Sequence, residues 1–266
     1  MTRAASGSLA TPVILTFNEE RNIGRTLRSL AWAEEVVVVD SGSSDSTEQV
    51  ARNFPNVQWV VRTFDTHAGQ WSFAINSAGT HRPYVLALDA DYQVPPAFVE
   101  ELSNQFGPGE YAGGIAGFRY AILGRELAGS VYPAKLVLFR PELVKISQPG
   151  HTQEMDVEGP IYHFTEKLIH DDRKPLARFV SSQMEYSRLE ADRLERDATK
   201  RWQDRLRRLG LMPLVAGLGA YVKSGGPLKG SASLHYAYER ALFECLLALR
   251  VLNPDDTTDT RSDIKR

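Results

Sequence analysis

Cysteine is almost absent from this chain of 266 residues, which holds only Cys245. A disulfide within the chain is therefore impossible, and a reducing compartment is the natural setting for such a protein. Neither sign of charge is in excess, because 31 Lys and Arg face 33 Asp and Glu and leave a formal net charge of -2. Without a global basic field we expect no nucleic-acid partner, and any anionic ligand should be bound locally.

Long hydrophobic runs are also missing. The longest uncharged apolar run, residues 209–222, contains Pro213, Gly217 and Gly219 and falls short of the roughly 20 residues that a membrane-spanning helix needs. Residues 1–10 include no apolar stretch of signal-peptide length, so we expect no secretory signal. The expected location is cytoplasmic, either free or peripheral on the inner face of the cytoplasmic membrane.

Strand-like and helix-like patterns alternate over the first ninety residues. The pattern predicts strands over residues 12–17, 36–39, 57–61 and 84–88, and helices over 19–30, 46–53 and 71–78. Such alternation predicts a mostly parallel sheet covered by helices on both faces, the α/β class of Rossmann-like folds. In these sheets ligands bind beyond the carboxyl ends of the strands, so the polar residues that end each strand are the candidate site.

The pattern changes after a helix that starts at Pro95 and Pro96. Residues 118–123 and 135–139 flank a Gly-rich stretch, as a hairpin or two adjacent strands would. From Arg178 onward the chain reads as helical. We therefore expect three parts, namely an α/β domain over residues 1–177, a helical extension over 178–252 and a frayed tail over 253–266.

Leu88-Asp89-Ala90-Asp91 places two carboxylates one residue apart directly after an apolar strand. Carboxylate oxygens at one point suit a hard cation, and Mg²⁺ or Mn²⁺ held this way typically also binds substrate phosphates. The alternative is a solvated turn. Asp89 and Asp91 are accordingly candidate metal ligands.

Within residues 36–47, an apolar run predicts a buried strand that ends in Asp40. Small residues then lead to Asp45. Asp40 at the strand end would accept hydrogen bonds from a nucleobase or ribose, and Gly42 lets a ligand approach the backbone. For Asp45 the favoured interpretation is structural, a cap on the following helix.

Thr16, Asn18 and Glu19 end the first strand. In a doubly wound sheet they lie beside Asp40 and would complete a nucleoside pocket. Asn18 is equally suited to cap the next helix, and both interpretations stay open.

Taken together, these motifs resemble family 2 of the glycosyltransferases, over roughly residues 10 to 175. They are, in chain order, Thr16-Phe17-Asn18-Glu19, Val39-Asp40-Ser41-Gly42-Ser43 with Asp45 and Thr47, Ala74-x-Asn76, and Leu88-Asp89-Ala90-Asp91. Two further segments, Leu138-Phe139-Arg140 with Gly150-His151-Thr152-Gln153-Glu154 and later Ile169-His170-Asp171-Asp172-Arg173, are similar to the branch of lipopolysaccharide-core glucosyltransferases.

The resemblance implies a GT-A-like fold and an inverting transfer from a nucleoside diphosphate sugar, with Mg²⁺ or Mn²⁺ as cofactor. It implies that Asp40 binds the base, that Asp89 lies on the ribose or diphosphate side and that Asp91 binds the metal, with His170 as a late ligand. The expected donor-binding residues are Thr16, Asn18, Glu19, Asp40, Asn76 and Asp89. For His170 a purely structural role stays open.

An inverting displacement needs a general base on the acceptor side. The resemblance makes Glu154 the first candidate and His151 the alternative, with Asp171 and Asp172 in reserve. The two aspartates are equally suited to begin the following helix and to pair with neighbouring basic residues.

Two residues depart from the family pattern. Tyr92 follows Asp91 where many relatives have an acidic residue, and Gln70 stands about where a Lys or Arg helps to bind diphosphate. They leave open a non-catalytic nucleotide-binding protein derived from a transferase. A dinucleotide-dependent oxidoreductase is disfavoured, because no Gly-x-Gly-x-x-Gly follows the first strand.

The expected function is transfer of a sugar to a saccharide acceptor in a surface glycolipid or polysaccharide, with polyprenyl phosphate as the alternative acceptor. The basic stretch 200–208 precedes the apolar run 209–222, and Lys223 and Lys229 follow it. That order suits a segment in the membrane interface. A helical hairpin packed on the catalytic domain or on a partner in a homodimer explains it as well.

Overall fold

The computed structural model describes residues 9–77, 82–107, 109–147, 154–196 and 202–253. These residues form two compact units. The first, the α/β unit, includes most of the chain up to Lys174, and the second, the helical unit, includes residues 127–131 and the chain from Pro175 onward.

A seven-stranded sheet forms the centre of the α/β unit, in the order β12-β6-β9-β4-β1-β2-β3. Its strands are β1 (Ala10–Thr16), β2 (Val36–Asp40), β3 (Val57–Val61), β4 (Tyr84–Asp89), β6 (Gly113–Ala116), β9 (Lys135–Phe139) and β12 (Ile161–His163). β3, β2, β1 and β4 are parallel, as are β12 and β6, while β9 runs antiparallel to its neighbours β4 and β6. The expected α/β class with a mostly parallel sheet is confirmed.

Side chains of the central strands alternate between two apolar layers. In β2, Val36 and Val38 belong to the core that contains Ile23 and Leu27 of helix α1 (Ile23–Ser29). The intervening Val37 belongs to the layer that contains Trp71 and Ala74 of α3 (His67–Ser77). A continuous valine run is what burial on both faces demands, because successive side chains of a strand point to opposite sides.

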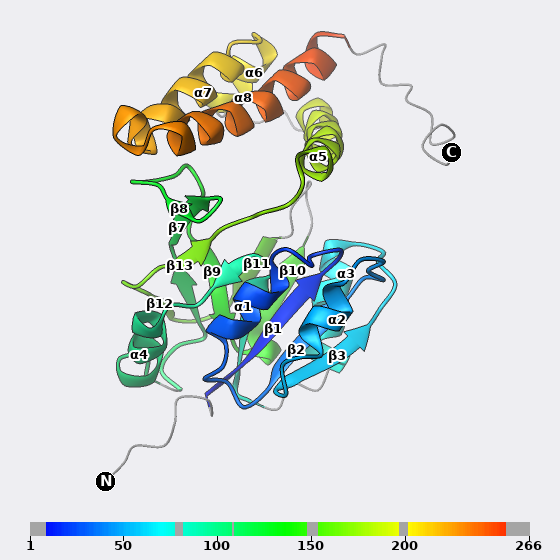
Figure 1. Ribbon diagram of the computed structural model, residues 1–266, viewed down its shortest axis with the longest axis vertical. Helices are drawn as coiled ribbons and strands as arrows, with labels where there is room; N and C mark the ends of the chain where they lie inside the picture. The colour runs from blue at the N-terminus through cyan, green and yellow to red at the C-terminus, as the bar shows by residue number, and fades with distance from the viewer. Residues whose placement is uncertain (1–8, 78–81, 108, 148–153, 197–201, 254–266) are drawn as a thin grey trace. The chain divides into compact units, whose positions relative to one another are not determined.

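Two further helices, α2 (Thr47–Ala51) and α4 (Pro96–Asn104), complete this unit around the sheet (Figure 1). The polar ends of β1, β2 and β4 lie at one edge, since these strands are parallel and in register at Thr16–Asp40 and Leu15–Asp89. The sheet thus brings the predicted donor-side residues of three strands to one place.

Strands occur at residues 118–122 and 135–139 as predicted, but the expectation that they form a hairpin or lie side by side was wrong. β7 (Phe118–Ile122) lies in a second sheet of order β5-β13-β7-β8, while β9 lies in the main sheet. The other members of the second sheet are β5 (Tyr92–Gln93), β8 (Arg125–Glu126) and β13 (Leu168–His170). The Gly-rich stretch between β7 and β9 includes residues 127–131, which belong to the helical unit.

The first helix begins later than predicted, at Ile23 and not at residue 19. Asn18 has a φ of 54°, and the backbone N–H of Glu19 donates to Thr47 Oγ1 at 2.6 Å. Residues 20–22 form a turn. The loop before α2 therefore holds this backbone out of a helix, which a pattern of apolar residues cannot reveal.

A short antiparallel pair, β10 (Val144–Ser147) and β11 (Glu154–Val157), follows the 3₁₀ turn Pro141–Leu143. β11 begins with the candidate base Glu154.

The helical unit consists of α5 (Leu176–Arg196), α6 (Trp202–Arg208), α7 (Met212–Lys223), the 3₁₀ turn η3 (Gly226–Lys229) and α8 (Ser231–Leu252). α8 is the central helix, because α5, α6 and α7 all contact it. Leu247 of α8 packs with Ala191 and Leu194 of α5. No helix of the described ranges is long and apolar enough to cross a membrane.

Candidate active site

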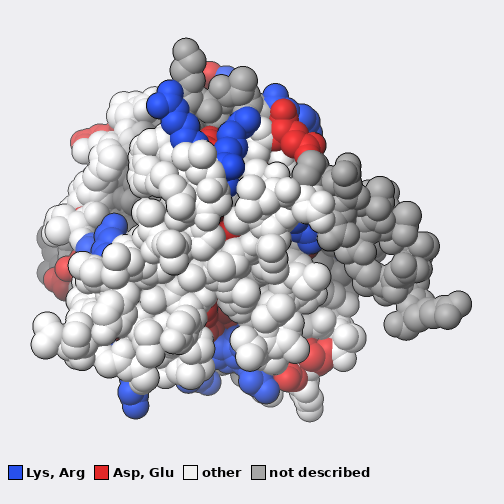
Figure 2. Space-filling model, turned by 90° about the horizontal axis from the view of Figure 1, so that it is seen from above, with Lys and Arg blue, Asp and Glu red and all other residues white. Residues whose placement is uncertain are grey.

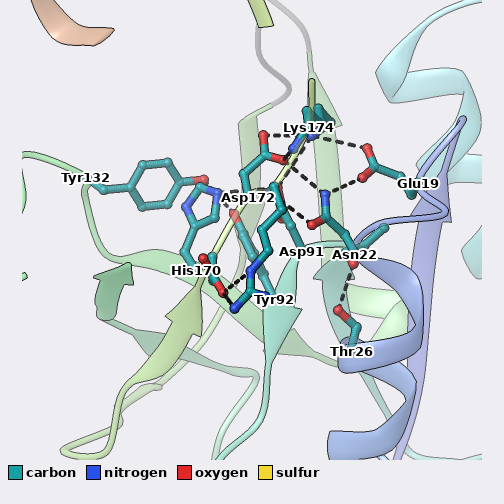
Figure 3. A network of polar contacts seen from close by, with 12 residues as sticks. Glu19, Asn22, Thr26, Asp91, Tyr92, Tyr132, His170, Asp172 and Lys174 are labelled. Atoms are coloured by element: carbon teal, nitrogen blue, oxygen red, sulfur yellow. Dashed lines mark hydrogen bonds and ion pairs between the residues drawn. The ribbon is translucent and has the colours of Figure 1, made fainter. Parts of the chain in front are cut away.

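Asp91 and His170 meet where the two sheets of the α/β unit adjoin. Strand β13 pairs with β5 so that His170 lies opposite Tyr92, and the N–H of Asp171 donates to the carbonyl oxygen of Asp91 at 3.2 Å. As a result His170 Nε2 lies 3.4 Å from Asp91 Oδ2 (Figure 3). Two predicted metal ligands, 79 positions apart in the sequence, are therefore neighbours in space.

Both side chains are buried, with 7% of Asp91 and 8% of His170 exposed. Asp91 Oδ1 and His170 Nδ1 have no hydrogen-bond partner among the described residues. An unsatisfied buried polar atom costs about 1–3 kcal/mol, and such atoms in a native fold call for an explanation. A ligand bound at Asp91 would satisfy the free oxygen, whereas His170 Nδ1 is not the ring nitrogen that faces Asp91.

Lys174 carries the positive charge nearest to this pair. Its Nζ lies 3.0 Å from Asp172 Oδ2, 3.1 Å from Glu19 Oε1 and 3.5 Å from Asp91 Oδ2. Burial works against the charged amine, but the three carboxylates outweigh it and hold the pKa of Lys174 well above its ordinary value. Burial also opposes ionisation of Asp91, yet the charges of His170 and Lys174 prevail and lower the pKa of that carboxyl.

Glu19 is the acid of this group whose pKa is raised. It is 7% exposed and accepts a hydrogen bond from Asn22 Nδ2 at 2.8 Å. Burial raises the pKa of Glu19 to about 7, with Lys174 opposing that rise and Asp91 adding to it. Near neutral pH this carboxyl group can therefore exchange a proton.

The start of α1 anchors the segment after β13. Asn22 Nδ2 donates to Asp172 Oδ1 at 3.0 Å, and Asn22 Oδ1 accepts the backbone N–H of Arg173 at 3.0 Å. Arg25 forms an ion pair with Asp171, which also pairs with Arg173 at 2.7 Å. The neighbouring guanidinium groups lower the pKa of Asp171 despite its partial burial. Of the interpretations left open for Asp171, the geometry matches pairing with neighbouring basic residues.

Asp172 belongs to the same cluster, where Lys174 and Asn22 bind its two oxygens. Neither aspartate begins the next helix, because α5 starts at Leu176.

An aromatic wall encloses the imidazole of His170. The rings of Tyr120, Tyr132 and Tyr92 lie 4.6, 4.7 and 5.1 Å from it, centre to centre. The hydroxyl groups of Tyr92 and Tyr132 are 2.5 Å apart, and Lys135 Nζ donates to Tyr92 at 3.2 Å. Tyr92, which departs from the family pattern, thus shields the histidine and has no free hydroxyl group.

Asp89 lies at the end of β4, half-buried, on the side of these tyrosines. Burial opposes the charged form of Lys135, but the nearby charge of Asp89 is the largest opposing influence and the pKa of Lys135 is raised. Asp89 therefore has a cationic neighbour of its own. No cluster of three or more His, Cys, Asp or Glu side chains suited to a metal occurs in the described ranges. Asp89 is not joined to Asp91 and His170.

Thr16, Asn18 and Asp40 come together as predicted at the ends of β1 and β2. The carboxylate of Asp40 accepts the N–H groups of Gly42 and Ser43 at 2.9 and 2.8 Å and the Ser43 hydroxyl group at 2.5 Å. The N–H of Asn18 donates to Ser43 Oγ at 2.7 Å. The amide of Asn18 accepts the N–H of Ser44 at 2.8 Å, so this side chain orders the loop and does not cap α1.

Asp45 is structural, as expected. Its Oδ1 accepts the N–H of Thr47 at 3.0 Å and also the Thr47 hydroxyl group, at the start of α2. Thr16 Oγ1 is buried and has no partner among the described residues.

The neutral Gln70 lies beside a cation. Arg62 donates to its amide oxygen, while Gln70 Nε2 donates to Ser41 Oγ at 2.7 Å. The guanidinium group of Arg62, the residue just after β3, therefore lies beside Gln70.

The structure does not bring the side chains of Asn76 and Glu154 to the Asp91 cluster. Asn76 is exposed on α3 and its amide donates to Ser72 O at 2.8 Å. The Glu154 side chain is exposed on β11 and makes no hydrogen bond or ion pair with a described residue, while its backbone pairs with Ser147 of β10. His151 lies outside the described residues.

Lys174, Asn22 and Arg25 were missed as site residues, although Lys174 is one of the basic residues next to Asp171 and Asp172 in the sequence. Their spacing gives no motif, and only proximity in the fold reveals them. The sole available signal was the run of charges from Asp171 to Lys174.

Replacing Lys174 by Met should strengthen Mn²⁺ binding. Without the ammonium group, three carboxylates share a buried site with no cation, and charges about 4 Å apart interact by about 4 kcal/mol at an effective dielectric of about 20. Bound Mn²⁺ should raise the melting temperature of the protein. We expect the Mn²⁺ concentration that gives half of this rise to fall about tenfold in Lys174→Met. Lys145→Met, at a side chain that is 71% exposed, is the matched control. The same half-saturating Mn²⁺ concentration for Lys174→Met and Lys145→Met would mean that Lys174 does not compete with a cation.

Residues 11–170 match the family described as Glycosyl transferase family 2. The chain belongs to that family. The match ends at His170, so that it includes both members of the buried pair and the four motifs from Thr16 to Asp91.

Among curated proteins, the family member described here is 30% identical over 112 residues to the lipopolysaccharide core biosynthesis glycosyltransferase LpsC of Rhizobium meliloti, over 41% of this chain and 40% of LpsC. It is 32% identical over 94 residues to an uncharacterized glycosyltransferase of Rickettsia typhi, over 35% of this chain and 31% of that protein. The matches thus span less than half the length of these relatives.

Solved structures give more distant likenesses. S. aureus TarS 1–349 in complex with UDP-GlcNAc is 14% identical, with a TM-score of 0.47 over 93% of this chain and 92% of that one. Glucosyl-3-phosphoglycerate synthase from Mycobacterium tuberculosis, in complex with Mn²⁺, UDP and glucosyl-3-phosphoglycerate, is 17% identical, with a TM-score of 0.42 over 71% and 80% of the two chains.

Proposed function

We propose that this family 2 glycosyltransferase moves a sugar, with inversion, from a nucleoside diphosphate sugar to a saccharide acceptor. The observation that carries the proposal is the buried Asp91–His170 pair, with one unsatisfied oxygen and one unsatisfied nitrogen, beside the strand-end loop of Asp40. This is the sheet edge where α/β folds bind ligands.

The pair fits Mg²⁺ or Mn²⁺ as cofactor. A carboxylate oxygen and an imidazole nitrogen are acceptable ligands for Mn²⁺, and Mg²⁺ usually takes only one or two carboxylates from the protein. Asp91 and His170 would hold the ion, and the remaining positions suit diphosphate oxygens and water. When bound, the ion would neutralise the charge that develops on the leaving diphosphate.

For the donor, we assign the base and ribose to the loop of Thr16, Asn18 and Asp40. Two oxygens of Asp40 already accept three hydrogen bonds from its loop, and a carboxylate has about four acceptor positions, so room for a ligand donor remains. Asp89 is assigned to the ribose or diphosphate side, where Lys135 adds a cation. Asn76 and Glu19 remain predicted donor-side residues.

The general base is assigned to Glu154, with His151 as the alternative. Glu154 is exposed and unengaged by described residues, as an acceptor-side base must be, whereas Asp172 is bound by Lys174 and Asn22. Glu154→Gln should lower transfer to a sugar hydroxyl by about a hundredfold, because base catalysis typically contributes 10²–10⁴-fold. Unchanged transfer would favour the polyprenyl phosphate acceptor, whose phosphate needs little base catalysis.

The acceptor class is a saccharide of a surface glycolipid or polysaccharide, on the cytoplasmic side of a membrane. The partial identity with LpsC supports a lipopolysaccharide-core-like acceptor.

A melting panel of UDP-, GDP-, dTDP- and CMP-sugars, with and without Mn²⁺, tests the donor assignment. A ligand at about 100 times its Kd stabilises the fold by about 2.7 kcal/mol. We expect a Mn²⁺-dependent upward shift with one nucleotide class, followed by release of the nucleotide when acceptor is added. A shift without any turnover would favour the non-catalytic nucleotide-binding protein, and no shift at all would contradict the proposal.

A further inference from the structure

Helix α7 presents an apolar stripe that no described residue covers. Its members are Leu211, Leu214, Val215, Leu218 and Val222, which are 47, 75, 42, 68 and 68% exposed. At 3.6 residues per turn these positions lie within about 100° of one another. The opposite side of the helix is the packed one, because Ala220 is fully buried and a Cβ on Gly217 would lie 3.2 Å from Ala241 of α8.

Exposed apolar side chains continue beyond α7. Leu228, in the turn η3, is 93% exposed. α8 adds Leu234, Tyr238, Leu249 and Leu252, which are 45, 66, 68 and 63% exposed. Contiguous apolar surfaces of this kind are unusual on monomeric proteins and mark sites of interaction.

The charged residues of the sequence stretch that carries the stripe have one sign. Between Asp204 and Glu239 the sequence contains no acidic residue, and its charged residues there are Arg205, Arg207, Arg208, Lys223 and Lys229. Lys223 and Lys229, at the end of α7 and in η3, are exposed. Figure 2 looks onto the helices α6 to α8 and shows a broad uncharged face with both basic and acidic side chains at its margin.

We propose that this face docks on the surface of a lipid bilayer that contains anionic lipids. Aliphatic side chains enter the boundary between head groups and acyl chains, while flanking cations meet the anionic head groups. A second copy of the chain fits less well. In a two-fold contact the same patch meets itself, and this stretch has no carboxylate to pair with the partner's lysines. The proposal does not depend on the donor or the acceptor.

Co-sedimentation with vesicles tests the docking. The full chain should pellet with vesicles of phosphatidylcholine and phosphatidylglycerol at 7:3, and less with phosphatidylcholine alone. Leu214→Ser with Leu218→Ser should lower the partition coefficient at least about tenfold, because two exposed leucines leave the interface. Lys223→Gln with Lys229→Gln should remove the preference for anionic vesicles, by roughly fivefold per lysine.

Leu176→Ser, at a leucine of α5 that is 71% exposed, is the control and should bind like the wild type. Circular dichroism and a melting curve establish that each variant is folded. Wild-type protein that stays in the supernatant with both vesicles, or stripe variants that pellet unchanged, would overturn the proposal. So would a dimer in sedimentation velocity that the stripe variant dissociates while vesicle binding is absent. No donor is present, so these results are independent of the transferase assay.

Discussion

Replacing Asp91 by Asn should lower sugar transfer by about a thousandfold. The amide keeps the shape of the side chain but removes the negative charge that lies 3.4 Å from His170 Nε2. A hard divalent cation loses its carboxylate ligand, and the loss of one preorganised electrostatic contact typically costs 10²–10³-fold in turnover. The measurement is transfer or donor hydrolysis at saturating donor, together with the Mn²⁺-dependent melting shift.

Asp45→Asn is the control for this substitution. Asp45→Asn makes the same chemical change in a neighbouring loop. Asp45 Oδ1 accepts a hydrogen bond from the N–H of Thr47, and the amide oxygen of an asparagine can accept it as well. We expect near wild-type transfer. An Asp91→Asn variant that retains both activity and the Mn²⁺ shift would show that the buried pair is not the metal site.

The central sheet was predictable because its strands are buried on both faces. β2 is buried at all five of its positions, and the predicted strand extends by one residue to Asp40. Local burial alone dictates such runs, so their pattern is legible without the rest of the chain. Once the strands are known to be parallel, their carboxyl ends must lie side by side. The proximity of Thr16 and Asp40 follows from this arrangement.

The predictions that were wrong concern features that depend on contacts between distant segments of the chain. The start of α1 is set by a hydrogen bond from Glu19 to Thr47, and β9 pairs with β4 and β6 because a different sheet takes β7. The local sequence pattern indicates neither the start of α1 nor the partners of β9. Strand pairing is decided by the whole sheet.

The site shows the same division. Asp91 and His170 were predicted, since a motif and a family resemblance both mark them. The role of Asn22, which bonds to Asp172 across 150 residues, is carried by no motif. Lys174 lies between three carboxylates that come from three segments, so its importance is visible only in the fold.

Replacing Arg207 by Met should destabilise the helical unit by about 3 kcal/mol. Arg207 donates to both oxygens of Glu244, at 3.0 and 2.7 Å, and to Glu190 Oε1 at 2.8 Å. Burial opposes its charge, but Glu244 outweighs that effect and raises the pKa of the guanidinium group. Because Glu244 is only 6% exposed, losing the arginine leaves a buried carboxylate without those hydrogen bonds, which typically costs 3–5 kcal/mol.

Urea unfolding measured on the full chain gives the change, and hydrogen exchange locates it in α5, α6 and α8. Arg188→Met is the matched control, because Arg188 is 43% exposed and pairs with Glu185 at the surface, where an ion pair contributes about 0–1 kcal/mol. Adding Glu244→Leu to Arg207→Met should recover part of the loss, since a buried ion pair replaced by apolar side chains is often neutral. A double variant less stable than Arg207→Met alone would mean that packing, and not the stranded carboxylate, causes the loss.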